Sequence, residues 1–372
     1  MKNKPLTEND KLQPLVPHLI LGTIALAFGI HVFLFLFYAA PSPLEGGYQS
    51  QTGSLSAFST LMAAWKKIFG GSPFSARLPS AFSAMAVIFL VSRIGQRWSS
   101  DQPASAALPL GLVLFPTAAY VFALATPHAL TTLLFVSVLH LAQLSRTTRP
   151  QIVIGAAGIL CALIPYLHVA GLSLSVVCIC LVIVQRGINR ETLVFAATAV
   201  ISFVALSLIF AIPFGARTGP LSLGVISGAL SDASVFKSYA MIWVAQAFSA
   251  IALIGSRPLR DLLGRSGLHR SVVLLAGFAF VSGWVSFVHD PSVESAKVAF
   301  SAVLIVGVLA ALPMVMWVRL VMPKLQSIFI WIALPVIMYS CFWVILGPVD
   351  LNGFPYDQLM PTTIISGAQS PR

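Results

Sequence analysis

Long, unbroken runs of apolar residues recur along the chain, separated by short polar stretches. Each run is about 20 residues long, the length that an α-helix needs to cross the hydrocarbon core of a bilayer. Apolar and polar residues do not alternate within the runs, so the pattern is typical of helices rather than of a β-barrel. The sequence therefore predicts about eleven membrane-spanning helices. We expect them near residues 17–40, 78–96, 104–124, 127–145, 151–168, 169–185, 191–213, 238–256, 271–288, 298–318 and 327–346.

One apolar stretch, 151–185, is long enough for two helices. Pro165 and Gly171 lie near its middle, and both residue types interrupt regular helix. We therefore expect two helices that meet in a tight turn around His168.

A shorter segment, 54–69, is amphipathic. Its apolar residues recur every three or four positions, which places them along one side of a helix, with Lys66 and Lys67 at the polar edge. The segment is too short and too amphipathic to span a bilayer, so we expect it to lie in the membrane interface. The apolar stripe consists of Leu55, Phe58, Leu61, Met62, Trp65, Ile68 and Phe69.

The composition agrees with a membrane protein. Of the 372 residues, 58% are hydrophobic and 9% are charged, whereas soluble domains carry about 25% charged residues. The expected fold is an all-α integral membrane protein, a polytopic helical bundle. We expect residues 1–346 to form one transmembrane domain, in which 41–77 is the first outer loop and contains the interfacial helix. The remaining residues, 347–372, form a short outer tail.

The basic residues predict the orientation in the membrane. Most of the 22 Lys and Arg residues fall in loops that lie on one side if the N-terminus is inside. Because basic loops stay in the cytoplasm, we expect a cytoplasmic N-terminus and an outer C-terminus, in the inner (plasma) membrane of a bacterium. The net charge of +11 is explained by such loops beside anionic lipid, and no nucleic-acid partner is expected.

The cysteine and histidine positions give no sign of a metal site. The four cysteines, Cys161, Cys178, Cys180 and Cys341, all fall within expected spans, where they are interpreted as core residues. The chain has no His-x-x-x-His pair and no cluster of outer acids, so we expect no metal ion and no cofactor. His31 falls in the middle of the first span, where it either faces a functional polar cavity or bonds to a neighbouring helix.

The first half of the chain resembles a known family. The first span is followed by an outer loop with a carboxylate and an interfacial helix, and then by FGGSPFSARLPSAFSA (69–84). This phrase is similar to the G-x-S-x-x-x-x-R-L-P-S pattern of glycosyltransferases of the GT-C fold that use polyprenyl-phosphate sugars. More narrowly, it resembles the protein mannosyltransferase and aminoarabinose transferase type. Residues 114–142 and 155–172 resemble its following spans and bend, and the resemblance covers about residues 15–190.

The resemblance implies transfer of a sugar at the outer face of the membrane. The donor is a polyprenyl-phosphate sugar, and the acceptor is an envelope glycan, lipid or protein. A carboxylate accepts the proton of the acceptor hydroxyl as its oxygen attacks the anomeric carbon. Cations or backbone donors stabilise the charge on the departing lipid phosphate. The implied partners are the donor, the acceptor and the bilayer, and protein partners are left open.

Glu45 is the candidate catalytic residue, because it is the only carboxylate between the first two spans. The family has an Asp-Glu pair followed by Tyr in this loop, and Glu45 with Tyr48 matches the second acid and the tyrosine. Leu44 occupies the place of the aspartate, which is the usual catalytic base. Glu45 is therefore either a base in a shifted loop or a loop carboxylate without a catalytic role.

The candidate substrate-binding residues are Tyr48, Arg77, His128 and His168. Arg77 lies at the outer mouth of the second span, where it either binds the lipid phosphate or snorkels to the interface. His128 stands where the family commonly has an acid, and His168 matches a family histidine in a bend that lacks the family's lysine. Both histidines are expected near the outer surface, and the alternative for each is a solvated or hydrogen-bonded ring.

Three functional hypotheses are compatible with the sequence. The first is a membrane glycosyltransferase, and the second is a catalytically degenerate GT-C-like subunit of an envelope assembly. The third is a transporter or flippase of a lipid-linked substrate, with His31 in its path. The chain has no Walker-type glycine loop and no nucleophile elbow, so ATP-driven transport and serine hydrolysis find no support.

Overall fold

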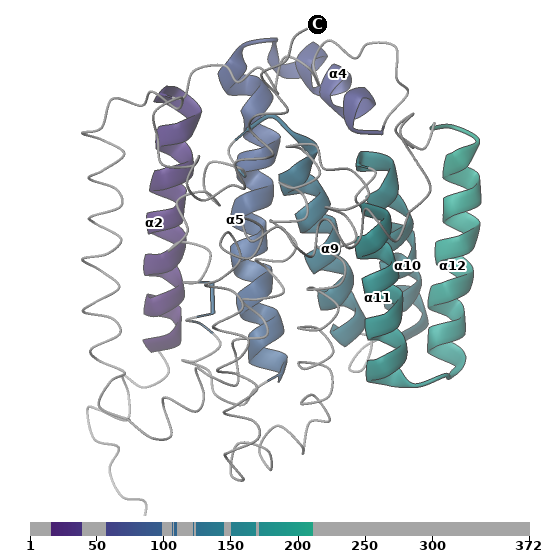
Figure 1. Ribbon diagram of the computed structural model, residues 1–372. Helices are drawn as coiled ribbons and strands as arrows, with labels where there is room; N and C mark the ends of the chain where they lie inside the picture. Colours follow the sequence, from purple (N-terminus) through teal and green to yellow (C-terminus); the bar gives the residue numbers. More distant parts are fainter. Residues whose placement is uncertain are drawn as a thin grey trace, which may run out of the picture.

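The computed structural model (Figure 1) describes residues 16–38, 57–98, 124–144, 150–168 and 171–210, together with 106, 108, 109 and 122. Within these residues every regular element is an α-helix, which confirms the expected all-α class for this part of the chain. The helices are α2 (Val16–Tyr38), α4 (Ala57–Phe69), α5 (Pro73–Trp98), α9 (Pro127–Leu144), α10 (Pro150–Leu167), α11 (Gly171–Arg186) and α12 (Arg190–Ser207).

Proline, serine and glycine fix the helix ends. The helices α5, α9 and α10 each begin with proline, whose fixed φ suits the first helical position and whose missing N–H is not needed there. The Ser72 side-chain oxygen caps α5 by accepting from the Ser75 N–H at 3.1 Å. At the other ends, Gly70 and Gly187 take positive φ values of 84° and 72° after α4 and α11, a conformation that glycine adopts at little cost.

The described helices other than α4 stand side by side, and α4 lies obliquely across one end of them (Figure 1). The neighbouring pairs are α2 with α5, α5 with α9, α9 with α10, α10 with both α11 and α12, and α11 with both α9 and α12. We call the end that carries α4 the α4 end and the opposite end the far end. At the α4 end α5, α9 and α11 begin, while α2, α10 and α12 finish.

Among the described residues, four helices are long and apolar enough to cross a membrane, namely α5, α9, α10 and α12. Shorter apolar helical segments occur at Pro17–Ile30 in α2 and at Leu174–Ile183 in α11. These helices correspond to the expected spans near 17–40, 78–96, 127–145, 151–168, 169–185 and 191–213, the last described up to 210. They are compatible with an integral membrane protein. The expected spans 238–256, 271–288, 298–318 and 327–346 lie outside the described residues, and of the span 104–124 only residues 106, 108, 109, 122 and 124 are described.

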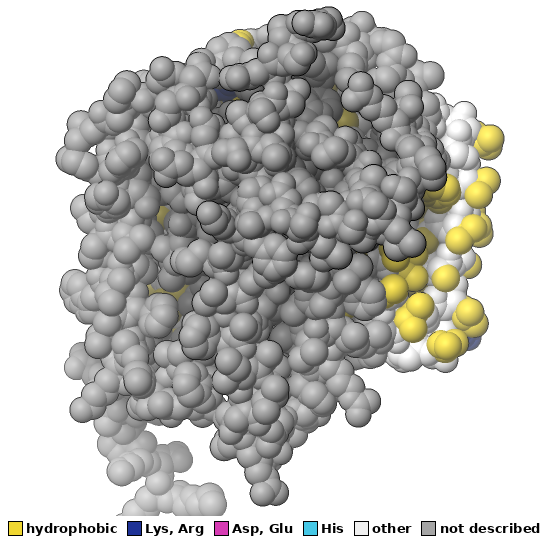
Figure 2. Space-filling view, in the orientation of Figure 1, with side chains coloured by type: hydrophobic (Ala, Val, Ile, Leu, Met, Phe, Trp, Pro, Cys, Tyr) yellow, Lys and Arg dark blue, Asp and Glu magenta, His cyan; other side chains and the backbone are white. Residues whose placement is uncertain are grey.

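The helix α12 presents an apolar face to the outside of the bundle. Only 17% of its most apolar window is buried, against 61% for α9. Figure 2 shows its hydrophobic side chains gathered along one edge of the molecule. The exposed residues of α12 include Leu193, Val200, Ile201 and Val204, and they are followed by exposed Leu208 and Ile209 directly after the helix. Such a surface suits contact with lipid chains.

The inner face of α12 packs closely against α10 at a glycine. A Cβ added to Gly158 would lie 2.6 Å from the Phe195 carbonyl oxygen and would also overlap Thr198 Oγ1. One turn earlier, a Cβ on Gly155 would meet Thr198 at an ordinary 3.6 Å. The absence of a side chain at Gly158 is therefore what lets these two helices approach.

The break between α10 and α11 confirms the turn expected around His168. The helix α10 ends at Leu167, and α11 begins at Gly171. The Gly171 N–H donates to the His168 carbonyl oxygen at 2.9 Å. A Cβ on Gly171 would lie 2.5 Å from the Ile164 carbonyl oxygen. The turn therefore requires glycine at this position.

A buried arginine joins three helices at the far end. Arg186, in the last turn of α11, donates through Nε to the Ala142 carbonyl oxygen near the end of α9 at 3.1 Å. It also forms an ion pair with Glu191 in the first turn of α12. The carbonyl oxygens of a helix's last turn have no partner inside the helix, and Arg186 supplies one for α9.

The cysteines that the structure describes lie in helices, as expected. Cys161 and Cys178 are buried, whereas Cys180 is partly exposed. Cys178 and Cys180 thus point in different directions from α11, as their spacing predicts. Cys341 lies outside the described residues.

Candidate functional site

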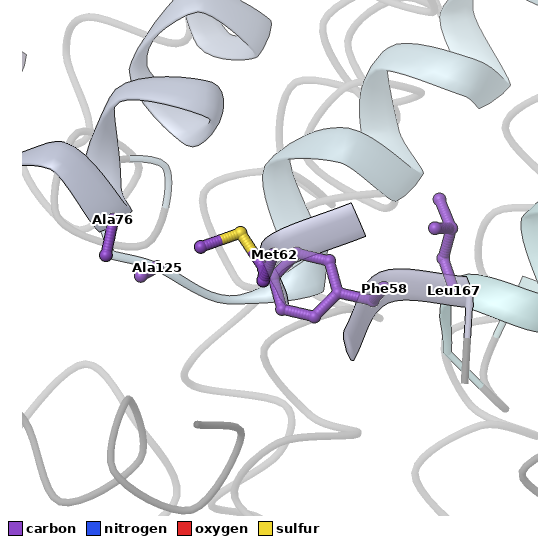
Figure 3. Close-up of a cluster of buried hydrophobic side chains, with 5 residues drawn as sticks. All are labelled: Phe58, Met62, Ala76, Ala125 and Leu167. Atoms are coloured by element: carbon purple, nitrogen blue, oxygen red, sulfur yellow. The ribbon is translucent and has the colours of Figure 1, made fainter. Parts of the chain in front are cut away.

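The α4 end contains a small apolar cluster that joins four segments of the chain. Phe58 and Met62 of α4 pack with Ala76 of α5, Ala125 before α9 and Leu167 at the end of α10. Figure 3 shows the two α4 side chains lying between Ala76 and Ala125 on one side and Leu167 on the other. The cluster therefore holds α4 over the ends of three helices.

Only part of the predicted apolar stripe of α4 enters this cluster. Phe58 is 4% exposed and Met62 is 7% exposed, but Leu61, Ile68 and Phe69 are exposed. The helix thus has one apolar contact with the bundle and further apolar side chains that face away from it. This arrangement fits the expected interfacial location, in which a bilayer receives the exposed side chains. Leu55 lies outside the described residues.

A hydrogen-bonded joint fastens the C-terminal part of α4 to the start of α5. The Trp65 indole N–H donates to the Ser75 carbonyl oxygen at 2.9 Å. The Ser75 hydroxyl donates to the Phe69 carbonyl oxygen at 3.2 Å. The Trp65 ring also stacks on Phe69, with centroids 4.1 Å apart. Both the apolar cluster and this joint therefore fix the position of α4 over the bundle.

Polar residues follow directly after three members of the apolar cluster. Arg77 follows Ala76, Thr126 follows Ala125, and His168 follows Leu167. Because neighbours in sequence share a depth in the bundle, these polar residues form a layer beside the cluster. We use the name α4-end polar layer for Arg77, Ser80, Thr126, His128 and His168.

Arg77 is buried, with 2% of its surface exposed. Its guanidinium donates to the carbonyl oxygen of Leu36, in the last turn of α2, at 3.4 Å. The alternative that Arg77 snorkels into the aqueous interface is therefore wrong, because its side chain turns into the protein. Binding of a lipid phosphate by Arg77 stays a prediction.

His128 and His168 are brought together at this end. Their ring centroids are 5.8 Å apart in an edge-to-face arrangement, although one begins α9 and the other follows α10. Both are buried, with 0% and 8% of their surfaces exposed. The alternative of solvated rings is wrong for both residues. Each imidazole can donate or accept a hydrogen bond, so the pair is a buried polar site beneath α4.

Ser80 and Thr126 complete the layer and were not predicted. The Ser80 hydroxyl reaches the Thr126 carbonyl oxygen at 3.5 Å, which links α5 to the segment before α9. The Thr126 hydroxyl oxygen is buried without a hydrogen-bond partner. Serine and threonine are too common in apolar helices for the sequence to single these two out. The signals that could have found them are the position of Thr126, two residues before His128, and the position of Ser80 at the end of the R-L-P-S motif that contains Arg77.

The α4-end polar layer holds one guanidinium, two imidazoles and two hydroxyls but no carboxylate. The only acid among the described residues is Glu191, which lies at the far end with Arg186. A carboxylate base at the α4 end must therefore come from a part of the chain outside those residues. Glu45 and Tyr48 both lie outside them, as does the side chain of His31. No group of three metal-binding side chains occurs within the described residues.

Comparisons of the chain with protein-family models, with curated protein sequences and with solved structures found no match.

Proposed function

We propose that this chain is an integral membrane glycosyltransferase. It moves a sugar from a polyprenyl-phosphate donor to a cell-envelope acceptor at the membrane face where α4 lies. The proposal includes a GT-C-like bundle of about eleven membrane-spanning helices. It also includes a location in a bacterial inner membrane with a cytoplasmic N-terminus and an outer C-terminus.

One observation carries the proposal. Arg77, His128 and His168 were singled out by resemblance to glycosyltransferases, and all three occur buried at one end of the bundle beneath α4. They come from three different helix ends. The resemblance requires such a convergence, because donor phosphate and acceptor must meet beside an interfacial helix. The hydropathy pattern alone does not require the three to share a site.

The residues have distinct roles in the proposed reaction. Glu45 accepts the proton of the acceptor hydroxyl while its oxygen bonds to the anomeric carbon. The bond from that carbon to the lipid-phosphate oxygen breaks, and the phosphate leaves with the electron pair. Arg77 and the two histidines stabilise this developing negative charge by donating hydrogen bonds. Tyr48 contacts the donor or the acceptor from the same loop as Glu45.

Sugar transfer by reconstituted protein tests the proposal. The purified chain is placed in vesicles with an isotope-labelled polyprenyl-phosphate sugar and an envelope extract as acceptor. Movement of label from the lipid to the acceptor is measured. The wild-type chain transfers label, Glu45→Gln reduces the rate by about 100-fold or more, and Glu45→Asp retains part of it.

A matched control removes a carboxylate elsewhere. Glu294 is expected in another outer loop, between the spans 271–288 and 298–318, so Glu294→Gln retains full activity. Normal transfer by Glu45→Gln would remove Glu45 from the mechanism.

A second function is favoured by one specific residue. Leu44 stands where the family has its catalytic aspartate, which suits a degenerate subunit of an envelope assembly. In that case the wild-type chain transfers no label but still binds the lipid-linked sugar. Passage of the intact labelled lipid across the vesicle membrane, without transfer, would instead identify a transporter.

A further inference from the structure

Two buried cysteines lie at the same depth in the neighbouring helices α10 and α11. Cys161 of α10 is 1% exposed and Cys178 of α11 is 0% exposed, and both are free thiols. The two helices pack against each other and are joined by the turn around His168. With a rise of about 1.5 Å per residue, Cys161 lies about 9 Å before the end of α10 and Cys178 lies about 10 Å after the start of α11. Measured from the turn that the helices share, the two cysteines are therefore level.

Ser175 places the Cys161 side chain against one turn of α11. The Ser175 hydroxyl donates to the Cys161 carbonyl oxygen at 2.8 Å, and the Cys161 thiol donates to the Ser175 carbonyl oxygen at 3.6 Å. Cys178 lies three positions after Ser175, on the same face of α11, and both residues are buried. A helical side chain covers the turn that is N-terminal to its own Cα. The Cys178 side chain therefore extends toward the turn that contacts Cys161.

The two sulfur atoms are in contact. The Cys161 and Cys178 side chains form a hydrogen bond with each other. Because the Cys161 thiol already donates its proton to Ser175, the Cys178 thiol donates and the Cys161 sulfur accepts. An S–S bond is about 2 Å long, so thiols that already touch can be joined after a small movement of their side chains.

A pair of touching thiols has a chemistry that a single buried cysteine lacks. Alone, a buried cysteine packs as a small apolar side chain. Two thiols in contact can each lose a hydrogen and form a disulfide, which would join α10 to α11 across the turn that contains His168. Cys180 provides an internal comparison, because it is partly exposed and points in a different direction from Cys178.

The surroundings of the pair limit which oxidant can reach it. The helix α10 is long and apolar enough to cross a membrane, and Cys178 lies in the apolar segment Leu174–Ile183 of α11. Entry of a charged oxidant into such surroundings is costly. A quinone dissolves in the bilayer and accepts two electrons together with two protons, so its reduction leaves no net charge among the helices.

We propose that Cys161 and Cys178 form a redox-active pair that a membrane-soluble quinone oxidises to a disulfide. The two S–H bonds break and one S–S bond forms. Two electrons and two protons pass to the quinone, which becomes a quinol. A small dithiol reverses the change by thiol–disulfide exchange. The pair is separate from the α4-end polar layer, and its oxidation does not depend on the proposed transferase reaction.

Counting free thiols tests the proposal. The full chain is reduced, reconstituted in lipid vesicles and incubated with decylubiquinone or with glutathione disulfide, which is charged. The chain is then denatured and labelled with N-ethylmaleimide, and its mass is measured. The reduced chain has four cysteines to label, and we expect treatment with the quinone to remove two of these labels. Glutathione disulfide should form no link between Cys161 and Cys178, and dithiothreitol should restore the labels lost to the quinone.

Serine substitutions separate this pair from the other cysteines. Cys161→Ser and Cys178→Ser should each keep labels on all of their remaining thiols after quinone treatment. The matched control, Cys180→Ser, removes the more exposed neighbour and should still lose two labels. Proteolytic peptides should show Cys161 joined to Cys178 in the wild-type chain and in this control. The peptide map of the wild-type chain decides the question even if a serine variant does not fold.

Different results would overturn different parts of the proposal. Absence of the link between Cys161 and Cys178 after quinone treatment would overturn the site itself. A link that joins Cys180 or Cys341 to another cysteine instead would show that the contact between α10 and α11 does not govern oxidation. Equal linking by glutathione disulfide and by the quinone would overturn the assignment to a lipid-soluble oxidant.

Discussion

Arg186 donates to the carbonyl oxygen of Ala142 at 3.1 Å, although the two residues are 44 positions apart. The same guanidinium forms an ion pair with Glu191. At the α4 end, Arg77 bonds in the same way to the carbonyl oxygen of Leu36. Each buried arginine therefore satisfies the open end of a neighbouring helix, where carbonyl oxygens lack partners.

Removing the Arg186 guanidinium should destabilise the bundle. In Arg186→Met, the Ala142 carbonyl oxygen and the Glu191 carboxylate both lose their bond to the guanidinium, so we expect a loss of about 1–3 kcal/mol in the free energy of unfolding. Unfolding in detergent, followed by circular dichroism, measures it. Glu191→Gln should cost less because the Glu191 side chain is 29% exposed. Equal stability of Arg186→Met and wild type would show that the contact has no stabilising role.

The contact between α10 and α12 should tolerate no side chain at Gly158. An added methyl overlaps the Phe195 carbonyl oxygen and Thr198, so Gly158→Ala should lower the free energy of unfolding by about 2 kcal/mol or more. The matched control is Gly155→Ala, whose methyl meets only an ordinary 3.6 Å contact. We expect that control to be nearly neutral. Similar losses in both variants would point to a general effect of replacing glycine.

The Trp65 hydrogen bond should hold α4 against the start of α5. Trp65→Phe removes the N–H that reaches the Ser75 carbonyl oxygen but keeps a ring that can stack on Phe69. We expect a cost of about 1 kcal/mol and faster hydrogen exchange in the amides of α4. Trp65→Ala removes both contacts and should speed that exchange further. Unchanged exchange in both variants would show that the apolar cluster alone positions α4.

Arg77 should contribute to stability and, under the proposed function, to donor binding. Arg77→Met loses the bond to Leu36 and should cost about 1–3 kcal/mol in the free energy of unfolding. It should also raise the KM for the polyprenyl-phosphate sugar about tenfold or more. Arg77→Lys keeps the positive charge, so it should recover donor binding more fully than stability. If the lysine recovers stability alone, Arg77 serves only as a cap for α2.

The sequence by itself determined which segments are helices and where several of them end. Runs of apolar residues set the spans, while Pro165 and Gly171 set the break around His168. These features depend on a residue's own chemistry and on its near neighbours, which the sequence displays directly. For the same reason the amphipathic pattern located α4, and sequence position correctly placed Arg77, His128 and His168 at helix ends.

Only the tertiary structure decided how those helix ends meet. Hydropathy gives the depth of a residue in a membrane, but not which helix lies beside it or which side of its own helix faces inward. The burial of Arg77, its bond to Leu36 and the contact between the His128 and His168 rings all depend on those neighbours. The same is true of Ser92 and of Gln143, because each becomes unusual only when packing removes it from water without giving it a partner.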